Sequence, residues 1–315
     1  MYASAQSTED LSFVLQHAQP GDTIVTGAAN FGEIVLTGFS FSPAVKVVFH
    51  QDATIERMTL NHSTGLHFEN ATINAGVSNR PQSERAIFIS GGGDIQFDHA
   101  TVSWSDDGNN ANDGTGIIAD GVRSLTIQSS EFHHALVGVQ VRTSSDVTIQ
   151  NNHFSNIVAD GIVVSGTSKL NILENVCINW TRIDGANAHP DCIQLQSGFR
   201  AVANTHTRIA GNVMLKGVGE RFQGIFVSSR HADSAHINTV IEDNIARLDV
   251  GLGIGASNVD GLIIRNNDIR ASQKATEAPR IVVYDNANNV KVIDNVAARI
   301  RTPQGSIVSG NTLPQ

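Results

Sequence analysis

The chain has 315 residues, of which 40 % are hydrophobic and only 16 % are charged, and its formal net charge is −9. A negative balance disfavours nucleic acid and anionic membrane surfaces as partners. No apolar run approaches the roughly 18 residues of a membrane-spanning helix, and no signal peptide is visible at the start. The 28 glycines, together with abundant Asn, Thr and Ser, suit many short strands joined by tight turns.

The first predicted element is a helix over residues 7–18. Ser7 or Thr8 can cap it, and acidic residues follow in the first turn, where the helix dipole favours them. The apolar positions fall on one face: Leu11, Val14, Leu15 and Ala18. Pro20-Gly21 ends the helix. We expect residues 1–22 to form an N-terminal segment whose helix covers an open strand edge.

Residues 23–315 are expected to form one elongated all-β domain, because paired hydrophobic positions recur along them. The first position of each pair is apolar: Ile87, Ile117, Val139, Ile162, Ile193, Ile225, Ile254 and Val282. A second apolar position follows ten residues later in six of the eight pairs and sixteen residues later in the other two. The period is 22–32 residues, which leaves room for short strands and turns but no helix. Such repeats stack as coils, so equivalent positions become spatial neighbours.

The second strand of each repeat runs into a polar turn that often ends in Asn. These Asn residues are Asn152, Asn175, Asn212, Asn244, Asn267, Asn295 and Asn311. We expect them to stack as a ladder with their amides bonded between coils, in a structural role.

The two cysteines, Cys177 and Cys192, fall at different positions of the repeat. The sequence therefore predicts free thiols and gives no compartment.

Two aspartates mark the predicted functional site. Asp160 and Asp191 each lie two residues before the first apolar position of consecutive coils. Neighbouring strands are about 4.8 Å apart, so the two carboxylates should lie side by side and raise the pKa of one of them. His189 and Arg221 stand two residues further back on neighbouring coils. We predict these four residues as the catalytic group.

The position after each apolar residue, and the position two further on, should face outward over the same groove. Candidate substrate-binding residues there are Gln194, Gln196, Arg142 and Phe226, with Arg182 and Arg230 at the rim. Insertions near these coils are expected to wall a groove suited to an extended polymer. The acidic segment 106–113 matches no EF-hand spacing and is expected to be a solvated loop.

Two chemistries fit the predicted group. A carboxylate pair can hydrolyse a glycosidic bond as acid and base. Alternatively, Asp160 and Asp191 can hold Ca²⁺, a hard cation, so that the metal or Arg221 neutralises a uronate carboxylate. His189 would then remove the C5 proton, which leads to β-elimination or epimerisation.

The helix followed by residues 19–25 (QPGDTIV) and the coil pattern resemble the right-handed parallel β-helix superfamily of polysaccharide lyases, epimerases and polygalacturonase-like hydrolases. Asp160-Gly161-Ile162, followed one coil later by Asp191-Cys192-Ile193, is similar to the catalytic segments of polygalacturonases. That resemblance implies that Asp160 and Asp191 are catalytic carboxylates. Ala159 and Pro190 depart from the family's Thr and Asp, and Gln223-Gly224 stands where His-Gly is expected. In epimerases Asp, Pro and His occur together in another order.

The resemblance implies a single-domain right-handed parallel β-helix that acts on a polysaccharide. We favour a polysaccharide lyase or C5-epimerase working at a uronate, with a glycoside hydrolase as the alternative. A second alternative is a non-catalytic glycan-binding or phage tailspike-type β-helix. The protein is expected to be secreted, periplasmic or phage/particle-associated, with Ca²⁺ as the one candidate cofactor. The C-terminal end has no predicted cap, so another copy of the chain would be able to cover it.

Overall fold

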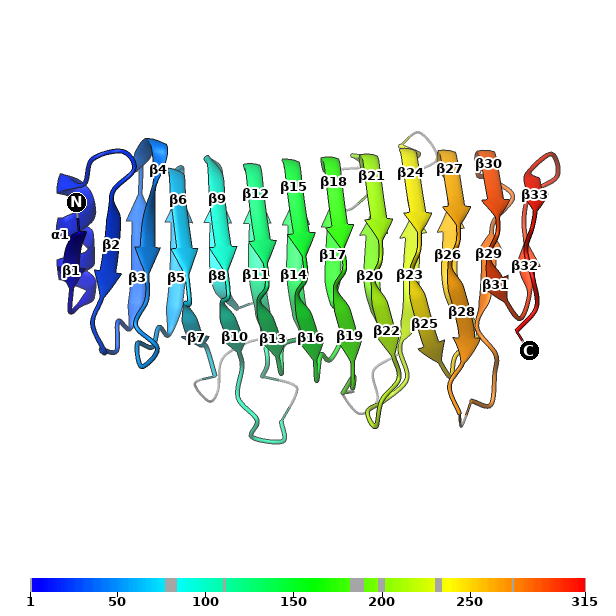
Figure 1. The fold of residues 1–315 in the computed structure, drawn as a ribbon, viewed down its shortest axis with the longest axis horizontal. Helices are drawn as coiled ribbons and strands as arrows, with labels where there is room; N and C mark the ends of the chain where they lie inside the picture. The colour runs from blue at the N-terminus through cyan, green and yellow to red at the C-terminus, as the bar shows by residue number, and fades with distance from the viewer. Residues whose placement is uncertain are drawn as a thin grey trace.

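The computed structural model describes residues 2–76, 84–109, 112–181, 190–197, 202–229, 234–273 and 275–314. Within these residues the strands form three long parallel sheets, and from β5 to β31 successive coils give one strand to each sheet (Figure 1). This arrangement confirms the predicted single-domain right-handed parallel β-helix.

The first sheet has thirteen described strands. In order they are β1 (Tyr2–Ala5), β2 (Thr23–Thr26), β4 (Ser40–Val48), β6 (Thr64–Glu69), β9 (Gly93–Asp98), β12 (Arg123–Gln128), β15 (Ser145–Gln150), β18 (Ser168–Leu173), β21 (Thr205–Ala210), β24 (His236–Glu242), β27 (Val259–Arg265), β30 (Asn288–Ile293) and β33 (Ile307–Ser309).

The second sheet has eleven strands in the described part of the chain, and it carries the candidate site. They are β3 (Glu33–Thr37), β5 (Arg57–Asn61), β8 (Arg85–Ser90), β11 (Thr115–Asp120), β14 (Val137–Arg142), β17 (Ile162–Ser165), β20 (Asp191–Gln196), β23 (Gln223–Ser228), β26 (Leu252–Ser257), β29 (Arg280–Val283) and β32 (Ile300–Arg301).

The third sheet is made of shorter strands, nine of them in the described ranges. They are β7 (Thr72–Asn74), β10 (Thr101–Ser103), β13 (Glu131–His133), β16 (His153–Ser155), β19 (Val176–Ile178), β22 (Val213–Leu215), β25 (Ile245–Leu248), β28 (Asp268–Ala271) and β31 (Val296–Ala297).

The core is the stack of inward side chains inside the coil. The apolar positions predicted from the sequence pair in register from Ile87 to Ile254, and they are fully buried. The prediction for the last apolar position, Val282, is wrong by one residue, because the register shifts between β26 and β29. There Ile254 pairs with Ile281, and Val282 pairs with Gly255 on the outward row.

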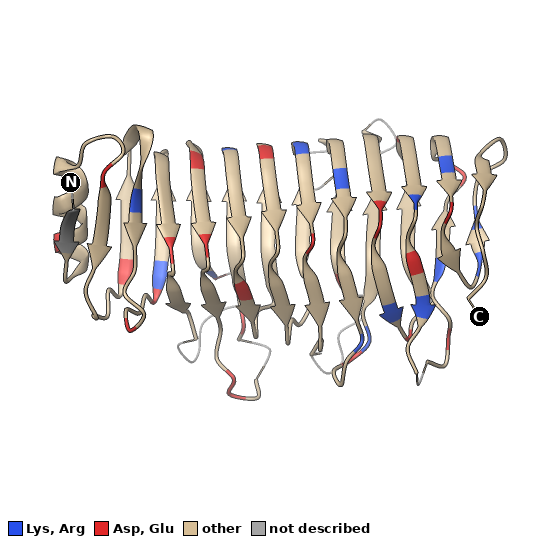
Figure 2. Ribbon diagram, in the orientation of Figure 1, with Lys and Arg blue, Asp and Glu red and all other residues tan. Residues whose placement is uncertain are grey.

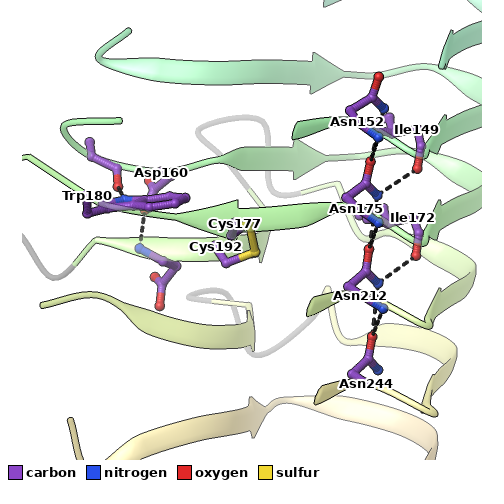
Figure 3. Close-up of a disulfide and its surroundings, with 12 residues drawn as sticks. Ile149, Asn152, Asp160, Ile172, Asn175, Cys177, Trp180, Cys192, Asn212 and Asn244 are labelled. Atoms are coloured by element: carbon purple, nitrogen blue, oxygen red, sulfur yellow. Dashed lines mark hydrogen bonds between the residues drawn. A yellow bond between two sulfur atoms is a disulfide. The ribbon is translucent and has the colours of Figure 1, made fainter. Parts of the chain in front are cut away.

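The predicted Asn ladder is confirmed at the turn between the first and third sheets (Figure 3). In each step the backbone N–H and the side-chain amide of one Asn donate to the Oδ1 of the next. Each amide also donates to a backbone carbonyl, as Asn175 does to Ile149. Seven residues take part: Asn152, Asn175, Asn212, Asn244, Asn267, Asn295 and Asn311. Consecutive coils from Asn152 to Asn311 are thereby tied together at the same corner.

The helix α1 (Thr8–His17) begins at the predicted cap, where the Ser7 side chain accepts a hydrogen bond from the Asp10 backbone. Leu11 and Leu15 bury its apolar face at the N-terminal end of the coil. At the other end, β33 leaves Ile307 and Val308 56 % and 47 % exposed. That another copy covers this end stays a prediction.

Candidate functional site

Asp160 and Asp191 lie next to each other where the chain passes from the third sheet into the second. Asp191 opens β20, and Asp160 stands two residues before β17. The Asp191 backbone N–H donates to Asp160 Oδ1 over 2.9 Å (Figure 3). The structure thus brings together the two carboxylates that the repeat pattern predicts as neighbours, although they are 31 residues apart in the sequence.

Burial raises the pKa of both carboxyl groups. The pKa of Asp160 rises from 3.8 to about 6, chiefly because the group is withdrawn from water. The pKa of Asp191 rises well above its ordinary value through burial first and the neighbouring Asp160 charge second. Asp160 is partly exposed and Asp191 is buried. Both carboxyl groups therefore hold their protons to higher pH than an exposed aspartate does.

Asp191 is only partly satisfied by its neighbours. The Gln194 side chain donates to Asp191 Oδ2 over 3.3 Å, whereas Asp191 Oδ1 is buried and accepts no hydrogen bond from the described residues. Gln223 pairs with Asp191 from the next strand and extends the same row of the sheet. A buried carboxylate oxygen without a donor is costly, and such costs concentrate at functional sites.

Trp180 anchors the backbone beside Asp160, a contact that the sequence pattern does not predict. Its ring stacks on Phe222 with centroids 4.2 Å apart, and its Nε1–H donates to the Ala159 carbonyl over 2.7 Å. A side chain at Gly161 would lie 2.6 Å from the Cys192 carbonyl oxygen and 3.3 Å from the Trp180 ring. Asp160 is therefore held between an anchored carbonyl and an obligatory glycine.

The prediction of free thiols is wrong: Cys177 and Cys192 form a disulfide, with their Cα atoms 5.9 Å apart. The two residues occupy different repeat positions because the bond crosses the interior of one coil, from β19 to β20, instead of joining equivalent positions of two coils (Figure 3). Cys192 directly follows Asp191, so the bond braces the strand that carries this carboxylate.

Arg221 faces the following coil. Its Nη2 donates to Thr276 over 2.8 Å, and its Nε lies 3.6 Å from a carboxylate oxygen of Asp249. These contacts direct the guanidinium toward the following coil and away from the carboxylate pair. To act as the predicted electrostatic clamp, Arg221 would have to break them.

The outward row over the second sheet contains the predicted substrate-binding residues that the structure describes. Gln194, Gln196 and Phe226 are half-buried, and Arg142 is exposed and donates to Gln140. His189, Arg182 and Arg230 lie outside the described residues. Their assignment as base and rim residues stays a prediction.

Within the described residues, the carboxylate pair does not form a metal site. Among the described residues, no three His, Cys, Asp or Glu side chains lie close enough together to hold a metal ion. Two of the oxygens that would face a cation instead accept N–H groups, from Asp191 and Gln194. The described residues therefore offer no further ligand for Ca²⁺ beside the pair, and the assignment of Asp160 and Asp191 as metal ligands stays a prediction.

Comparison with known proteins agrees with this architecture. Residues 45–214 match the model of the right-handed beta helix region, and the chain belongs to that family. No curated protein matches the sequence.

Solved structures share the fold at low sequence identity. A surface adhesin of Streptococcus pneumoniae superposes with a TM-score of 0.70 at 14 % identity, covering 98 % of this chain and 91 % of that one. An alginate lyase from Paenibacillus gives 0.57 at 14 % identity, covering 100 % and 99 %. A polygalacturonase from Erwinia carotovora gives 0.58 at 10 % identity, covering 99 % and 97 %.

In the described part of the chain, no helix is long and apolar enough to cross a membrane.

Proposed function

We propose that this protein is a polysaccharide-degrading enzyme that hydrolyses glycosidic bonds by acid/base chemistry at Asp160 and Asp191. The observation that carries the proposal is the adjacent carboxylate pair, which shares a raised affinity for protons and has no cationic partner among the described residues. Glycoside hydrolysis needs one protonated and one ionised carboxyl group at the same bond. A pair in which burial raises the pKa of both carboxyl groups favours this mixed state.

The different environments of the two carboxyl groups give them different catalytic roles. Asp191, the more buried group, holds the proton and acts as the general acid. Asp160 is more exposed and ionises near pH 6, so it acts as the base or nucleophile. The Gln194 amide rests on Asp191 Oδ2. Productive binding requires this side chain to rotate and expose the acid to the substrate oxygen.

A lyase or epimerase working at a uronate is the second candidate. It is favoured by the full-length likeness to an alginate lyase and to a periplasmic alginate epimerase. It needs His189 as base and Arg221 as clamp, and the guanidinium of Arg221 is turned toward Asp249. Hydrolysis needs only the two groups that lie in contact, and for that reason we place it first.

A panel of neutral and uronate polysaccharides, assayed for reducing ends and for the ultraviolet absorbance of unsaturated products, separates the candidates. Reducing ends without absorbance are the expected result. Absorbance gain would replace hydrolysis by elimination. Binding without either product would favour a non-catalytic glycan-binding role, or epimerisation, which proton exchange at C5 would reveal.

The matched variants are Asp160→Asn and Asp191→Asn, with Asp243→Asn as the control. Asp243 is an exposed carboxylate at the opposite corner of the coil, in the turn before the ladder residue Asn244. We expect each of the first two to lower kcat by about 100-fold or more, and the control to keep full activity. Full activity in Asp160→Asn or Asp191→Asn would disprove the site.

The disulfide bears on where the enzyme works. Disulfides form and persist in oxidising compartments, so Cys177–Cys192 supports an extracellular or periplasmic location. Large polysaccharides are found in the same compartments.

A further inference from the structure

The outward face of the third sheet carries a second group of polar side chains on two neighbouring strands, β13 and β16. They are Glu131, His133, His153 and Ser155, which share this face because alternate residues of a strand point to the same side. Glu131 pairs in register with His153, and His133 pairs with Ser155. The four side chains therefore lie together, although the two strands are one coil apart in the sequence.

Three of these side chains form a continuous chain of hydrogen bonds. His133 Nδ1 lies 2.7 Å from Ser155 Oγ, and His133 Nε2 lies 3.1 Å from Glu131 Oε2. An ionised carboxylate only accepts hydrogen bonds, so the neutral imidazole carries its proton on Nε2 and accepts the Ser155 hydroxyl proton at Nδ1. The serine thus donates to a base that a carboxylate holds in one orientation.

Glu131 has His133 as its partner and forms no ion pair with a neighbouring strand. From β7 to β22, the described strands of the third sheet contain no Lys or Arg, and Glu131 is their one acidic residue (Figure 2). The Glu131 side chain is 58 % exposed and that of His133 is 25 % exposed, whereas Ser155 is 7 % exposed. The carboxylate therefore faces water, and the hydroxyl is screened from it beneath the imidazole.

His153 completes the group beside the serine. Its ring lies edge-on to that of His133, with the two centroids 6.2 Å apart. Burial, and then the neighbouring His133, lower the pKa of His153. A neutral imidazole keeps one N–H, and this donor is available to negative charge that develops on an oxygen beside Ser155.

A serine hydroxyl bonded to an oriented imidazole is the arrangement used for acyl transfer. We propose that Ser155, His133 and Glu131 hydrolyse carboxylic esters as nucleophile, base and orienting carboxylate. His153 donates to the oxyanion. Because the group lies on an open face of the sheet, it suits acyl groups carried on the hydroxyls of a polymer. The polysaccharide as carrier rests on the proposed function, whereas the ester chemistry does not.

The reaction needs no co-reactant except water. Ser155 Oγ bonds to the acyl carbon while its proton passes to His133 Nδ1. The ester C–O bond then breaks, and His133 gives this proton to the departing alcohol oxygen. Water attacks the acyl-serine and gives a proton to His133, which returns it to Ser155 Oγ as the carboxylic acid leaves.

The test uses the full chain with p-nitrophenyl acetate, and with a fluorophosphonate that labels activated serines. We expect the wild type to turn over the ester and to gain one adduct, mapped to Ser155 by mass spectrometry. Ser155→Ala should abolish the adduct and lower kcat/KM by about 100-fold or more, as should His133→Ala. Glu131→Gln should lower kcat and leave KM unchanged, because it releases the His133 tautomer without removing a group that touches the ester.

Ser103→Ala is the matched control. Ser103 pairs with His133 from the other side, on β10, but its hydroxyl donates to Asn74 Oδ1 over 2.9 Å. This variant should keep both turnover and adduct. Ser155→Ala should melt within about 2 °C of the wild type and keep its glycoside hydrolysis, which separates loss of the ester site from loss of the fold or of the proposed function.

Turnover retained by Ser155→Ala would show that an imidazole alone cleaves the ester, and it would overturn the proposal. No turnover by the wild type, or an adduct at another residue, would overturn it as well. Acetate release from acetylated xylan or acetylated alginate, lost in Ser155→Ala, is the expected result with a polymer. Turnover of p-nitrophenyl acetate without any such release would overturn the polysaccharide as the carrier of the ester.

Discussion

Two corners of the same coil carry stacked polar residues, and they are satisfied to very different degrees. At the corner between the first and third sheets, each buried Asn both donates and accepts along the stack. At the corner between the third and second sheets, Asp160 and Asp191 stack at the same spacing, and a carboxylate oxygen is left without a donor. Figure 3 shows the two arrangements side by side.

The difference follows from the chemistry of the side chains. An amide has two donors and an acceptor, so identical amides can repeat indefinitely along a coil. An ionised carboxylate only accepts, so two of them in register repel and retain a proton instead. The repeat thus stabilises the fold where it stacks amides and creates reactive groups where it stacks acids. The reactive corner is braced differently, by a disulfide inside one coil.

The largest expected loss of stability comes from placing a carboxylate in the Asn ladder, which makes that corner chemically similar to the corner with Asp160 and Asp191. Asn175→Asp removes the amide that donates to Ile149 and to Asn212 Oδ1, at 2.9 and 3.0 Å. It places carboxylate oxygens against two acceptors in a fully buried position. We expect a loss of about 4 kcal/mol in the free energy of unfolding, measured by urea denaturation.

The matched control is Asn151→Asp, at the exposed residue that directly precedes Asn152, the neighbouring member of the ladder. Asn151 has a φ of 54°, which Asp tolerates nearly as well as Asn. Its unfolding midpoint should stay close to that of the wild type. A similar loss in both variants would mean that added charge, not the broken amide ladder, destabilises the protein.

The second-largest loss of stability is expected on removal of the Cys177–Cys192 disulfide, which braces the corner with Asp160 and Asp191. The disulfide closes a loop with a sequence separation of 15, and cross-links of that length contribute about 3 kcal/mol. The double variant Cys177→Ala/Cys192→Ala should lose about this much in urea denaturation. Wild type held in reductant throughout unfolding is the control and should move to the same midpoint. An unchanged midpoint in both would show that the coil is held here by packing alone.

The sequence predicted those parts of the molecule that depend on its period. The coil, the Asn ladder and the adjacency of Asp160 and Asp191 follow from counting, since stacked strands share one register. The disulfide and the support from Trp180 did not follow, because they depend on which residues face each other across one coil. The expectation of a solvated loop over residues 106–113 is wrong at Asp113, which is only 1 % exposed. Insertions have no period, so their burial cannot be counted along the chain.

The smallest effect is a pH dependence that separates the two corners. Because the folded-state pKa of Asp160 is about 6 rather than 3.8, the folded protein holds more protons than the unfolded chain between these values. Its contribution to stability is therefore present at low pH and is lost as pH rises through this window. Asp191 acts in the same direction. Glu242 acts in the opposite direction: burial raises its pKa, but the hydrogen bonds from its two arginine partners outweigh burial and lower the pKa overall.

The difference between wild type and Asp160→Asn cancels these other groups and isolates the pair. Urea unfolding at several pH values between about 4 and 7 should show the wild type losing roughly 2 kcal/mol relative to the variant. Asp243→Asn, beside the ladder, should follow the wild type at every pH. A wild-type minus Asp160→Asn difference that does not change with pH would mean that the pKa of Asp160 is the same in the folded and the unfolded protein. Stacking beside Asp191 would then leave the Asp160 carboxyl group like an exposed one, and the contrast between the two corners, on which the hydrolytic assignment rests, would be lost.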